Sequence, residues 1–501
     1  MLRNIGSNWI LILATIAATY VLTPFIIDTL GAEGYGTWTL ITSMTGYINL
    51  LALGVPMACV RYLAQHVAEH DVREVNRTIG SCAGLYLAIG LIAVLGGTGL
   101  MALFGAYAIP ATLVTEAHVA FGLMVLHVSA GFIGLLPEGI MFAHHDFVPR
   151  NLIRMGGVLL RLGLTSGLLT LDASLVLLAL AQIACLALDF GVSWFLIRRR
   201  YPGIRISLAD FDRRVVGRIF SFSVYVLMLT AGARLSFETN ALVVGAFLGV
   251  GSIPFYVVAN ALVVYLMEFV IAIAAVVSPM ATRLNTEGRA DELREMFLKW
   301  SKVAVSLTIM VGLFLIILGP RFIGWWIDPS YERPSGTVLQ ILTVSSFAFL
   351  PVRGVAVPVL MGLGKPKVPA IASAAAGLLS LGLSVLLIGP LGLTGVALGT
   401  AVPNVLFALV VLIVACRELQ LTPARYLHYV VPRAVVGAVP ALALLLWFKL
   451  RLDVQSFMGL AAAGSAMVLS FAVTWVAFVY RHDPYVDLRA QLVRLRASSG
   501  P

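Results

Sequence analysis

Charged side chains lie inside long apolar stretches of this chain. Five of them fall near the centres of such stretches: Arg161, Arg234, Arg353, Glu238 and Glu268. A charged side chain at the centre of a bilayer costs about 2.5–3.5 kcal/mol, and more where it faces lipid. Guanidinium groups bind phosphates, whereas carboxylates can take up protons or cations. The set therefore predicts a site for a charged ligand within a membrane, with the arginines facing the ligand.

Three arginines share one face of a helix predicted over 151–170. At about 100° per residue, Arg150, Arg154 and Arg161 project within about 40° of one another. At a rise of about 1.5 Å per residue, the stripe is about 16 Å long. Such a stripe suits an anion that enters from one end of the helix. The alternative is that Arg150 and Arg154 are ordinary basic residues at a helix end, and that only Arg161 is unusual.

The remaining in-span charges also admit two interpretations. Arg234 and Glu238 are four residues apart, so they can form a structural ion pair. Arg353 follows Pro351, and we expect the helix to be broken there, against protein or a wet cavity. Arg353 is therefore the strongest single candidate for a cation that faces the substrate. Glu268, like Glu238, is a candidate for proton or sodium coupling, although a buried protonated carboxyl group fits equally well.

Other kinds of chemistry find no support in the sequence. Residues 361–367 contain a Gly-Lys pair without the spacing of a phosphate loop, and His144-His145 has no third metal ligand in view. The four cysteines, Cys59, Cys82, Cys185 and Cys416, lie in or beside apolar runs without paired spacing. They read as small hydrophobic residues that form neither a disulfide framework nor a zinc site. We expect no enzyme activity, no metal and no cofactor.

The elements that carry these residues must be membrane spans. The chain has 501 residues, of which 60% are hydrophobic and only 12% charged, and its mean hydropathy is +0.97. Soluble domains are about 45–50% apolar and 25% charged. About 20 apolar residues cross a bilayer. Apolar runs of that kind predict about fourteen spans, within a range of twelve to fourteen: 7–27, 36–60, 79–107, 118–142, 151–170, 174–197, 218–246, 254–281, 303–327, 337–362, 368–388, 394–416, 433–448 and 456–480.

The basic residues predict the orientation of the spans. Connections after even-numbered spans are rich in arginine and lysine, as in the stretch 198–214, whereas 28–35 and 109–117 contain neither. Basic connections stay in the cytoplasm. We therefore expect a multi-pass protein of the bacterial inner membrane with both termini inside. The asymmetry accounts for the net charge of +10, so we expect no nucleic-acid partner.

Short motifs recur in the same order in the two halves of the chain. Leu30-Gly31, Pro56-Met57-Ala58 and Arg73-Glu74 are followed later by Leu248-Gly249, Pro279-Met280-Ala281 and Arg294-Glu295. An offset of six spans makes the repeat parallel. We predict an N-lobe over 1–205, a C-lobe over 206–418, an extra helix pair over 419–480 and a basic tail over 481–501. The tail can form an amphipathic helix on the inner leaflet, with Tyr485, Leu488, Leu492 and Leu495 on one face, or a frayed end.

Several of these segments resemble the polysaccharide-biosynthesis flippases of the multidrug/oligosaccharidyl-lipid/polysaccharide exporter superfamily. The resemblance rests on three stretches: 22–64 with Gly34-Tyr35-Gly36 and Arg61-Tyr62, 238–283 with Asn240, Leu248-Gly249 and Tyr256, and 362–397 with Gly389, Gly392 and Gly395. It implies two six-helix lobes around a central cavity that opens alternately to each side. It also implies movement of a polyprenyl-diphosphate-linked oligosaccharide from the inner to the outer leaflet.

The resemblance further implies membrane lipids and polysaccharide polymerase or glycosyltransferase machinery as partners. It carries over no site residues, so Arg154, Arg161, Arg234 and Arg353 are substrate-binding candidates from their chemistry alone. The main alternative is a cation-coupled multidrug extruder of the same superfamily, which should favour carboxylates in its cavity. A membrane scaffold that transports nothing is a third possibility. The slight cationic excess among the in-span charges favours an anionic substrate.

Overall fold

The computed structural model describes residues 2–52, 54–221, 224–451, 456–481, 483 and 485. Every regular element in these ranges is a helix, and none is a strand. Eleven of the described helices are long and apolar enough to cross a membrane. The chain is therefore a multi-pass, all-helical membrane protein, as the composition predicts.

The number of spans stays a prediction because the helices and the predicted spans do not match one to one. The first helix, α1 (Leu2–Ile48), contains a non-helical residue at Gly31, and α16 (Lys367–Glu418) contains one at Gly392. Each of these two helices covers two predicted spans. The predicted span 218–246 is instead divided among shorter helices: α7 (Arg213–Ser221), α8 (Val224–Phe237) and α9 (Thr239–Leu248).

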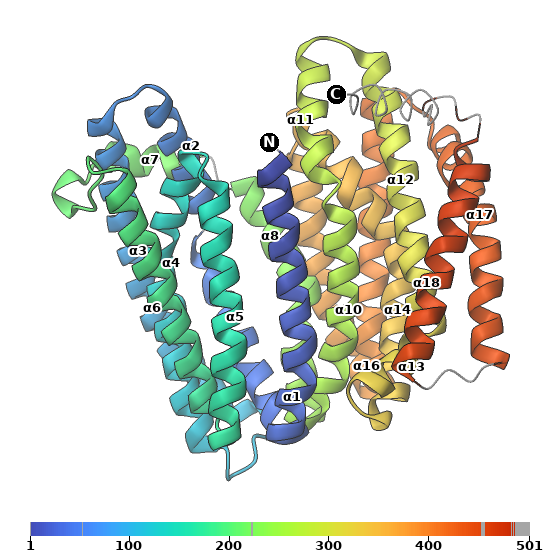
Figure 1. Cartoon of the computed structure of the whole chain (residues 1–501), viewed down its shortest axis with the longest axis horizontal. Coiled ribbons are helices and arrows are strands. Elements are labelled where there is room, and N and C mark those ends of the chain that lie inside the picture. The colour runs from blue at the N-terminus through green and yellow to red at the C-terminus, as the bar shows by residue number, and fades with distance from the viewer. Residues whose placement is uncertain are drawn as a thin grey trace, which may run out of the picture. The chain divides into compact units, whose positions relative to one another are not determined.

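By their contacts the residues form two compact units. Unit 1 comprises residues 1–234 and 241–254, and unit 2 comprises 235–240 and 255–501. The predicted lobes are defined by the repeat instead, and their boundaries stay predictions. In unit 1, α4 packs against α3 and α6, and α5 packs against α1 and α6 (Figure 1). The remaining helices of unit 1 are α2 (Val55–Ala68), α3 (Val72–Met101), α4 (Val114–Ala143), α5 (Phe147–Leu171) and α6 (Leu175–Arg200), with short turns η1 (Asn49–Ala52), η2 (Ala102–Ala106), η3 (Leu208–Asp210) and η4 (Val250–Ser252).

In unit 2, α12 packs against α14 and α17, and α14 packs against α16. The extra helix pair, α17 and α18, lies together and contacts α12. The helices of unit 2 are α10 (Ile253–Ile271), α11 (Ala274–Thr286), α12 (Ala290–Ile317), α13 (Gly319–Trp326), α14 (Glu332–Pro351), α15 (Val357–Gly362), α17 (Pro423–Arg451) and α18 (Phe457–Thr474), with α16 and the short η5 (Pro329–Tyr331), η6 (Val352–Ala356) and η7 (Trp475–Val479).

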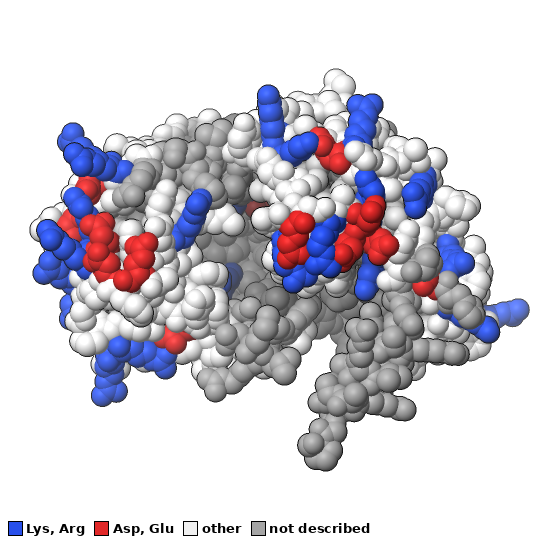
Figure 2. Space-filling model, turned by 90° about the horizontal axis from the view of Figure 1, so that it is seen from above, with Lys and Arg blue, Asp and Glu red and all other residues white. Residues whose placement is uncertain are grey.

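The basic connections of each unit gather at one end. In unit 1, Asp146 after α4 accepts hydrogen bonds from Arg200, the last residue of α6, and from Tyr201, which follows it, each at 2.7 Å. In unit 2, Arg294 near the start of α12 donates to the carbonyl of Leu419 at 2.7 Å. Figure 2 looks onto these ends and shows Lys and Arg beside Asp and Glu. We refer to them as the basic end of each unit.

Residues with positive φ recur at a constant separation along the chain. The sequence distance from Gly31 (φ 70°) to Gly249 (φ 83°) equals the distance from His70 to Gly288. The first two residues both precede a new helical segment, and the other two both end a helix in the left-handed region. This recurrence supports an internal repeat. It does not support every motif match, because Pro279 lies farther from Pro56 than this common distance and is therefore out of register.

The chain changes direction after Gly31 and again after Gly249. The two segments that follow these glycines contact each other within unit 1. A Cβ atom at Gly36 would lie 1.9 Å from the carbonyl oxygen of Val250 and 3.4 Å from Pro254. Pro254 is the repeat equivalent of Gly36, since it follows Gly249 at the position that Gly36 has after Gly31. Backbone therefore meets backbone at this point, and only glycine leaves room for the approach. We call this contact the corner contact.

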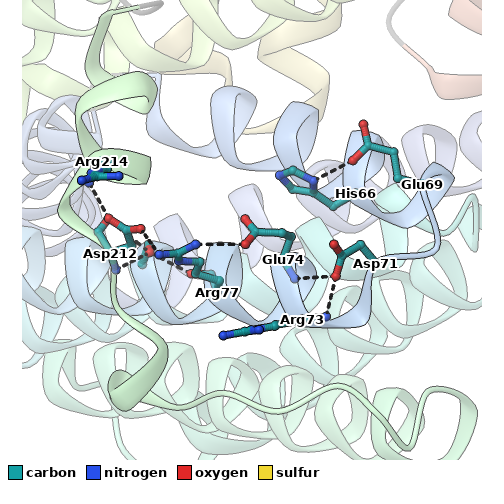
Figure 3. Close-up of polar contacts among 9 residues, drawn as sticks. His66, Glu69, Asp71, Arg73, Glu74, Arg77, Asp212 and Arg214 are labelled. Carbon is teal, nitrogen blue, oxygen red and sulfur yellow. Dashed lines mark hydrogen bonds and ion pairs between the residues drawn. The ribbon is translucent and has the colours of Figure 1, made fainter.

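The segment 203–212, which precedes α7, is strapped to one face of α3. The Asn76 amide donates to the carbonyl of Gly203 at 2.9 Å and accepts from the N–H of Arg205 at 3.0 Å. Arg77 forms an ion pair with Asp212 at 2.6 Å (Figure 3). Gly80 faces the carbonyl of Ser207, which would lie 2.4 Å from a Cβ atom there. We call this segment the strap.

Replacing Gly80 by leucine should detach the strap from α3. A leucine side chain cannot fit where the strap backbone now lies. The peptide bonds after Arg205 and Arg213 should therefore become accessible to trypsin. Cleavage should be faster by about tenfold, because local opening of the strap costs less free energy. Limited proteolysis of purified protein measures this rate. Gly96→Leu, on the same helix with no atom within 4 Å of its Cβ position, is the matched control. Equal cleavage of both variants would show that the strap is not held by this face.

A disulfide joins Cys59 on α2 to Cys82 on α3, with their Cα atoms 6.6 Å apart. The expectation that all four cysteines are unpaired is therefore wrong. The packing of α2 against α3 brings the two sulfur atoms together, and a separation of 23 residues in the sequence gives no sign of it. Cys185 and Cys416 are buried free thiols, as expected.

Candidate functional site

The three arginines predicted to form a stripe lie on one face of α5, and a glycine lies among them. Arg150, Arg154, Gly157 and Arg161 lie within about 60° of one another on the helix. The stripe faces α6, against which α5 packs, and the end of α4. We call the group formed by this stripe with Glu138 on α4 and Gln182 and Asp189 on α6 the charged seam.

Each arginine of the charged seam has a partner. Arg150 pairs with Glu138 at 3.3 Å, and Arg154 approaches the same carboxylate at 3.7 Å. With the Gln182 amide oxygen turned toward α5, it accepts two hydrogen bonds from Arg161, both at 3.1 Å. The Arg154 side chain is nevertheless 49% exposed, and Arg161 is an exposed residue as well, so unit 1 covers neither of the two arginines completely.

Asp189 is the one carboxylate of the seam with no close partner. Its two oxygens lie over Gly157 and would be 2.7 Å from a Cβ atom at that position. Within the described part of the chain no hydrogen bond or ion pair to this carboxylate occurs, and the charges that act on it are those of Glu138 and Arg154. Asp189 lies near the end of the predicted span 174–197 and was not among the site residues predicted from the sequence. Its spacing from Gln182, two helical turns along α6, is the signal that could have revealed the seam.

Arg234 lies in a different part of unit 1. It donates to the carbonyl of Gly46 at 3.0 Å and lines an open pocket of about 240 Å³. Asn49, Thr230 and Gly54 share the lining of the pocket, where span two is interrupted between η1 and α2. A cation and backbone groups freed by a helix break therefore meet in one pocket, which suits a polar or anionic group.

Arg353 belongs to unit 2 and lies in η6, a π-helical turn that follows Pro351. We had expected a broken helix at this position. The helix instead continues and widens into a π-helical turn. Such turns are frequent at functional sites. The guanidinium lies over the Phe349 ring, 5.9 Å from its centroid.

The two candidate coupling residues also belong to unit 2. Glu238 separates α8 from α9, so the predicted span is interrupted at this residue. Glu268 is exposed on α10. Neither lies in the charged seam, and their role in ion coupling stays a prediction. No group of histidine, cysteine, aspartate or glutamate side chains able to hold a metal occurs among the residues that the structure describes.

The structure also reveals buried polar groups that the sequence analysis did not single out as a site. Lys302 on α12 has no exposed surface and pairs with the buried Asp483, which accepts from Tyr429 at 2.8 Å. The Asn240 amide group donates to Tyr256 and Thr400, both at 2.9 Å. Asn240 and Tyr256 are among the residues that carry the family resemblance in the sequence. The resemblance is therefore the feature of the sequence that could have indicated this hydrogen-bond network. Of the predicted amphipathic tail, Leu488, Leu492 and Leu495 lie outside the described residues.

Comparison with known proteins shows the family. The model of a family described as "Polysaccharide biosynthesis protein" matches residues 1–285, which is more than half of the chain. The chain belongs to this polysaccharide biosynthesis protein family. The resemblance inferred from the sequence is thereby confirmed.

Two relatives match this chain over most of their own length. A "Putative O-antigen transporter" of Shigella flexneri is 21% identical over 400 residues, which cover 77% of this chain and 90% of the relative. The "Uncharacterized membrane protein EpsK" of Bacillus subtilis (strain 168) is also 21% identical, over 424 residues and 80% of each chain.

Solved structures confirm the predicted fold class. An inward-facing multidrug resistance MATE family transporter of the MOP superfamily matches with a TM-score of 0.71 at 16% identity, over 82% of this chain and 98% of that one. The lipid II flippase MurJ, in an inward closed conformation, matches with a TM-score of 0.70 at 13% identity, over 95% of this chain and 99% of that one. At these identities the likeness concerns the fold alone.

Proposed function

We propose that this protein is a flippase that moves a polyprenyl-diphosphate-linked oligosaccharide from the inner to the outer leaflet by alternating access. The observation that carries the proposal is that Arg154 and Arg161 stay exposed on a membrane-spanning helix of a polysaccharide biosynthesis protein. Exposed guanidinium groups at membrane depth suit the phosphates of a lipid-linked sugar. The relative named as an O-antigen transporter and the structural neighbour named as a lipid II flippase support this substrate class.

The energetics of the step agree with the proposal. A diphosphate carries about two negative charges, and moving one charge across a membrane potential of 100 mV is worth about 2.3 kcal/mol. Outward movement in a cell with a negative interior therefore gains roughly 5 kcal/mol. This direction requires the basic end of each unit to face the cytoplasm of a bacterial cell, with both termini inside.

Within this proposal Arg154 and Arg161 in the seam, Arg234 in its pocket and Arg353 in the π-helical turn bind the phosphates. Single glutamine substitutions at Arg161, Arg234 and Arg353 should each lower the rate of translocation by about tenfold or more, because a charge-assisted contact to phosphate is worth about 1.5–3 kcal/mol. A liposome assay with a fluorescent polyprenyl-diphosphate oligosaccharide measures the rate at matched expression.

Arg205→Gln, an exposed arginine of the strap, is the control for a general loss of positive charge. Full activity in all three single variants would show that these arginines do not bind the substrate. A cation-coupled drug extruder, the alternative, should instead lose activity when Glu238 or Glu268 is replaced by glutamine.

A further inference from the structure

The Asp189 carboxylate lies between two arginines that the proposed function assigns to the substrate. Gly157, over which it lies, is three residues after Arg154 and four before Arg161 on one face of α5. Glycine at this position lets the carboxylate reach the backbone of α5, because any Cβ atom would lie 2.7 Å from both oxygens. The carboxylate is only partly exposed, and no other described group forms a hydrogen bond or ion pair with it.

The charges around Asp189 can be listed for each helix that packs against α6. Arg154 from α5, Glu138 from α4 and Cys185 from α6 interact with Asp189 directly. Arg161 on α5 lies one turn beyond Gly157 and interacts with Cys185 and with His127 of α4. Glu138 is already engaged by Arg150 and Arg154. Asp189 is therefore the carboxylate that can move toward the two exposed guanidinium groups without breaking another ion pair.

We propose that Asp189 is an internal counter-ion that takes the place of the substrate's phosphates when the seam is empty. This inference rests on the proposed function. Arg161 has only the neutral Gln182 amide as its partner, and Arg154 shares the Glu138 carboxylate with Arg150. A cation at membrane depth without a full counter-charge is costly, because charges in a medium of low dielectric need a partner. A carboxylate on the neighbouring helix supplies one and competes with the diphosphate for the same guanidinium groups. Asp189 is thus a positioning residue for release of the substrate and for return of the empty carrier.

Binding of an anionic probe tests the proposal with the purified full-length protein. Geranyl diphosphate at pH 8 should bind about tenfold more tightly to Asp189→Asn than to the native protein, because the competing charge is gone. Gly157→Ala should change the affinity in the same direction, because the new methyl group displaces the carboxylate without altering any charge. Asp172→Asn, an exposed residue between α5 and α6, is the matched control and should bind as the native protein does.

A charge-conserving variant separates a counter-ion from a merely structural residue. The probe is methanedisulfonate, whose two charges do not change between pH 5 and 8. At pH 8 it should bind more tightly to Asp189→Asn than to the native protein, whereas Asp189→Glu, which keeps the negative charge, should bind it as the native protein does. Equal affinities of Asp189→Asn and Asp189→Glu would overturn the proposal.

The outcomes distinguish this inference from the proposed function. Binding that is lost in Arg154→Gln and Arg161→Gln but unchanged in Asp189→Asn and Gly157→Ala would overturn the counter-ion and leave the flippase proposal intact. Binding that survives both arginine substitutions would show that the seam is not the anion site, and the counter-ion would be wrong with it.

Discussion

Gly36→Ala is expected to abolish translocation and to destabilise unit 1 by about 1–3 kcal/mol. The single methyl group would lie 1.9 Å from the Val250 carbonyl oxygen, so the corner contact cannot close without moving one backbone away from the other. The variant should therefore loosen the corner contact, which is measured as faster labelling of a cysteine introduced at Glu33 by an impermeant maleimide.

The matched control for Gly36→Ala is Gly122→Ala on α4. No atom lies within 4 Å of a Cβ atom at Gly122, and alanine in a helix is about 0.5–1 kcal/mol better than glycine. This variant should keep native activity and a melting temperature at least as high. If Gly36→Ala translocates substrate as fast as Gly122→Ala, the corner contact has no part in the cycle.

Lys302→Met is expected to destabilise unit 2 by about 3–5 kcal/mol, since it leaves the Asp483 carboxylate buried without its cation. Both side chains are completely buried, and Lys302 also donates to the Val479 carbonyl at 3.0 Å. Its ammonium lies 4.8 Å from the centre of the Tyr429 ring. The apparent melting temperature should fall by about 5–10 °C. Unfolding followed by intrinsic fluorescence in detergent measures the shift.

A second ion pair provides the control for Lys302. Lys365 pairs with Glu418 at the basic end of unit 2, where Lys365 is 53% exposed. Lys365→Met should cost only about 0–1 kcal/mol, because exposed pairs are screened by water. The double variant Lys302→Met, Asp483→Leu should recover much of the lost stability, since no buried charge is left. A melting temperature indistinguishable from native for Lys302→Met alone would refute the assigned role of this pair.

The sequence was sufficient for the properties that depend on local composition. Apolar runs of about 20 residues predicted where helices lie, because a span must satisfy its backbone hydrogen bonds within itself. Basic residues predicted which connections share an end, as the contacts of Asp146 with Arg200 and of Arg294 with Leu419 bear out within each unit. The stripe from Arg150 to Arg161 could be read from the helical period of about 3.6 residues.

Properties that depend on pairing between distant helices could not be read in this way. Gln182, which accepts hydrogen bonds from the stripe, and Asp189, which lies over Gly157, belong to the next helix, and nothing in the local sequence sets the rotation of α6 against α5. The pairing of Cys59 with Cys82 was missed for the same reason. Lys302 lies just outside the predicted span 303–327 and was not singled out by the sequence, although α12 begins at Ala290 and buries it.

The drug-extruder alternative differs from the proposed function in the charge of its ligand. The charged seam holds three arginines and two carboxylates, which is one positive charge in excess if all are ionised. An excess of this sign repels a cationic drug and attracts a phosphate.

The most direct test of the proposed function is translocation in sealed liposomes by the purified full-length protein. A fluorescent polyprenyl-diphosphate oligosaccharide is placed in one leaflet, and its exposure to an impermeant quencher is followed with and without an imposed membrane potential. We predict protein-dependent translocation that is faster when the potential favours movement of the anion and slower in Arg161→Gln. Absence of translocation, together with gradient-driven efflux of a cationic dye by the same liposomes, would contradict the flippase function and identify a drug extruder.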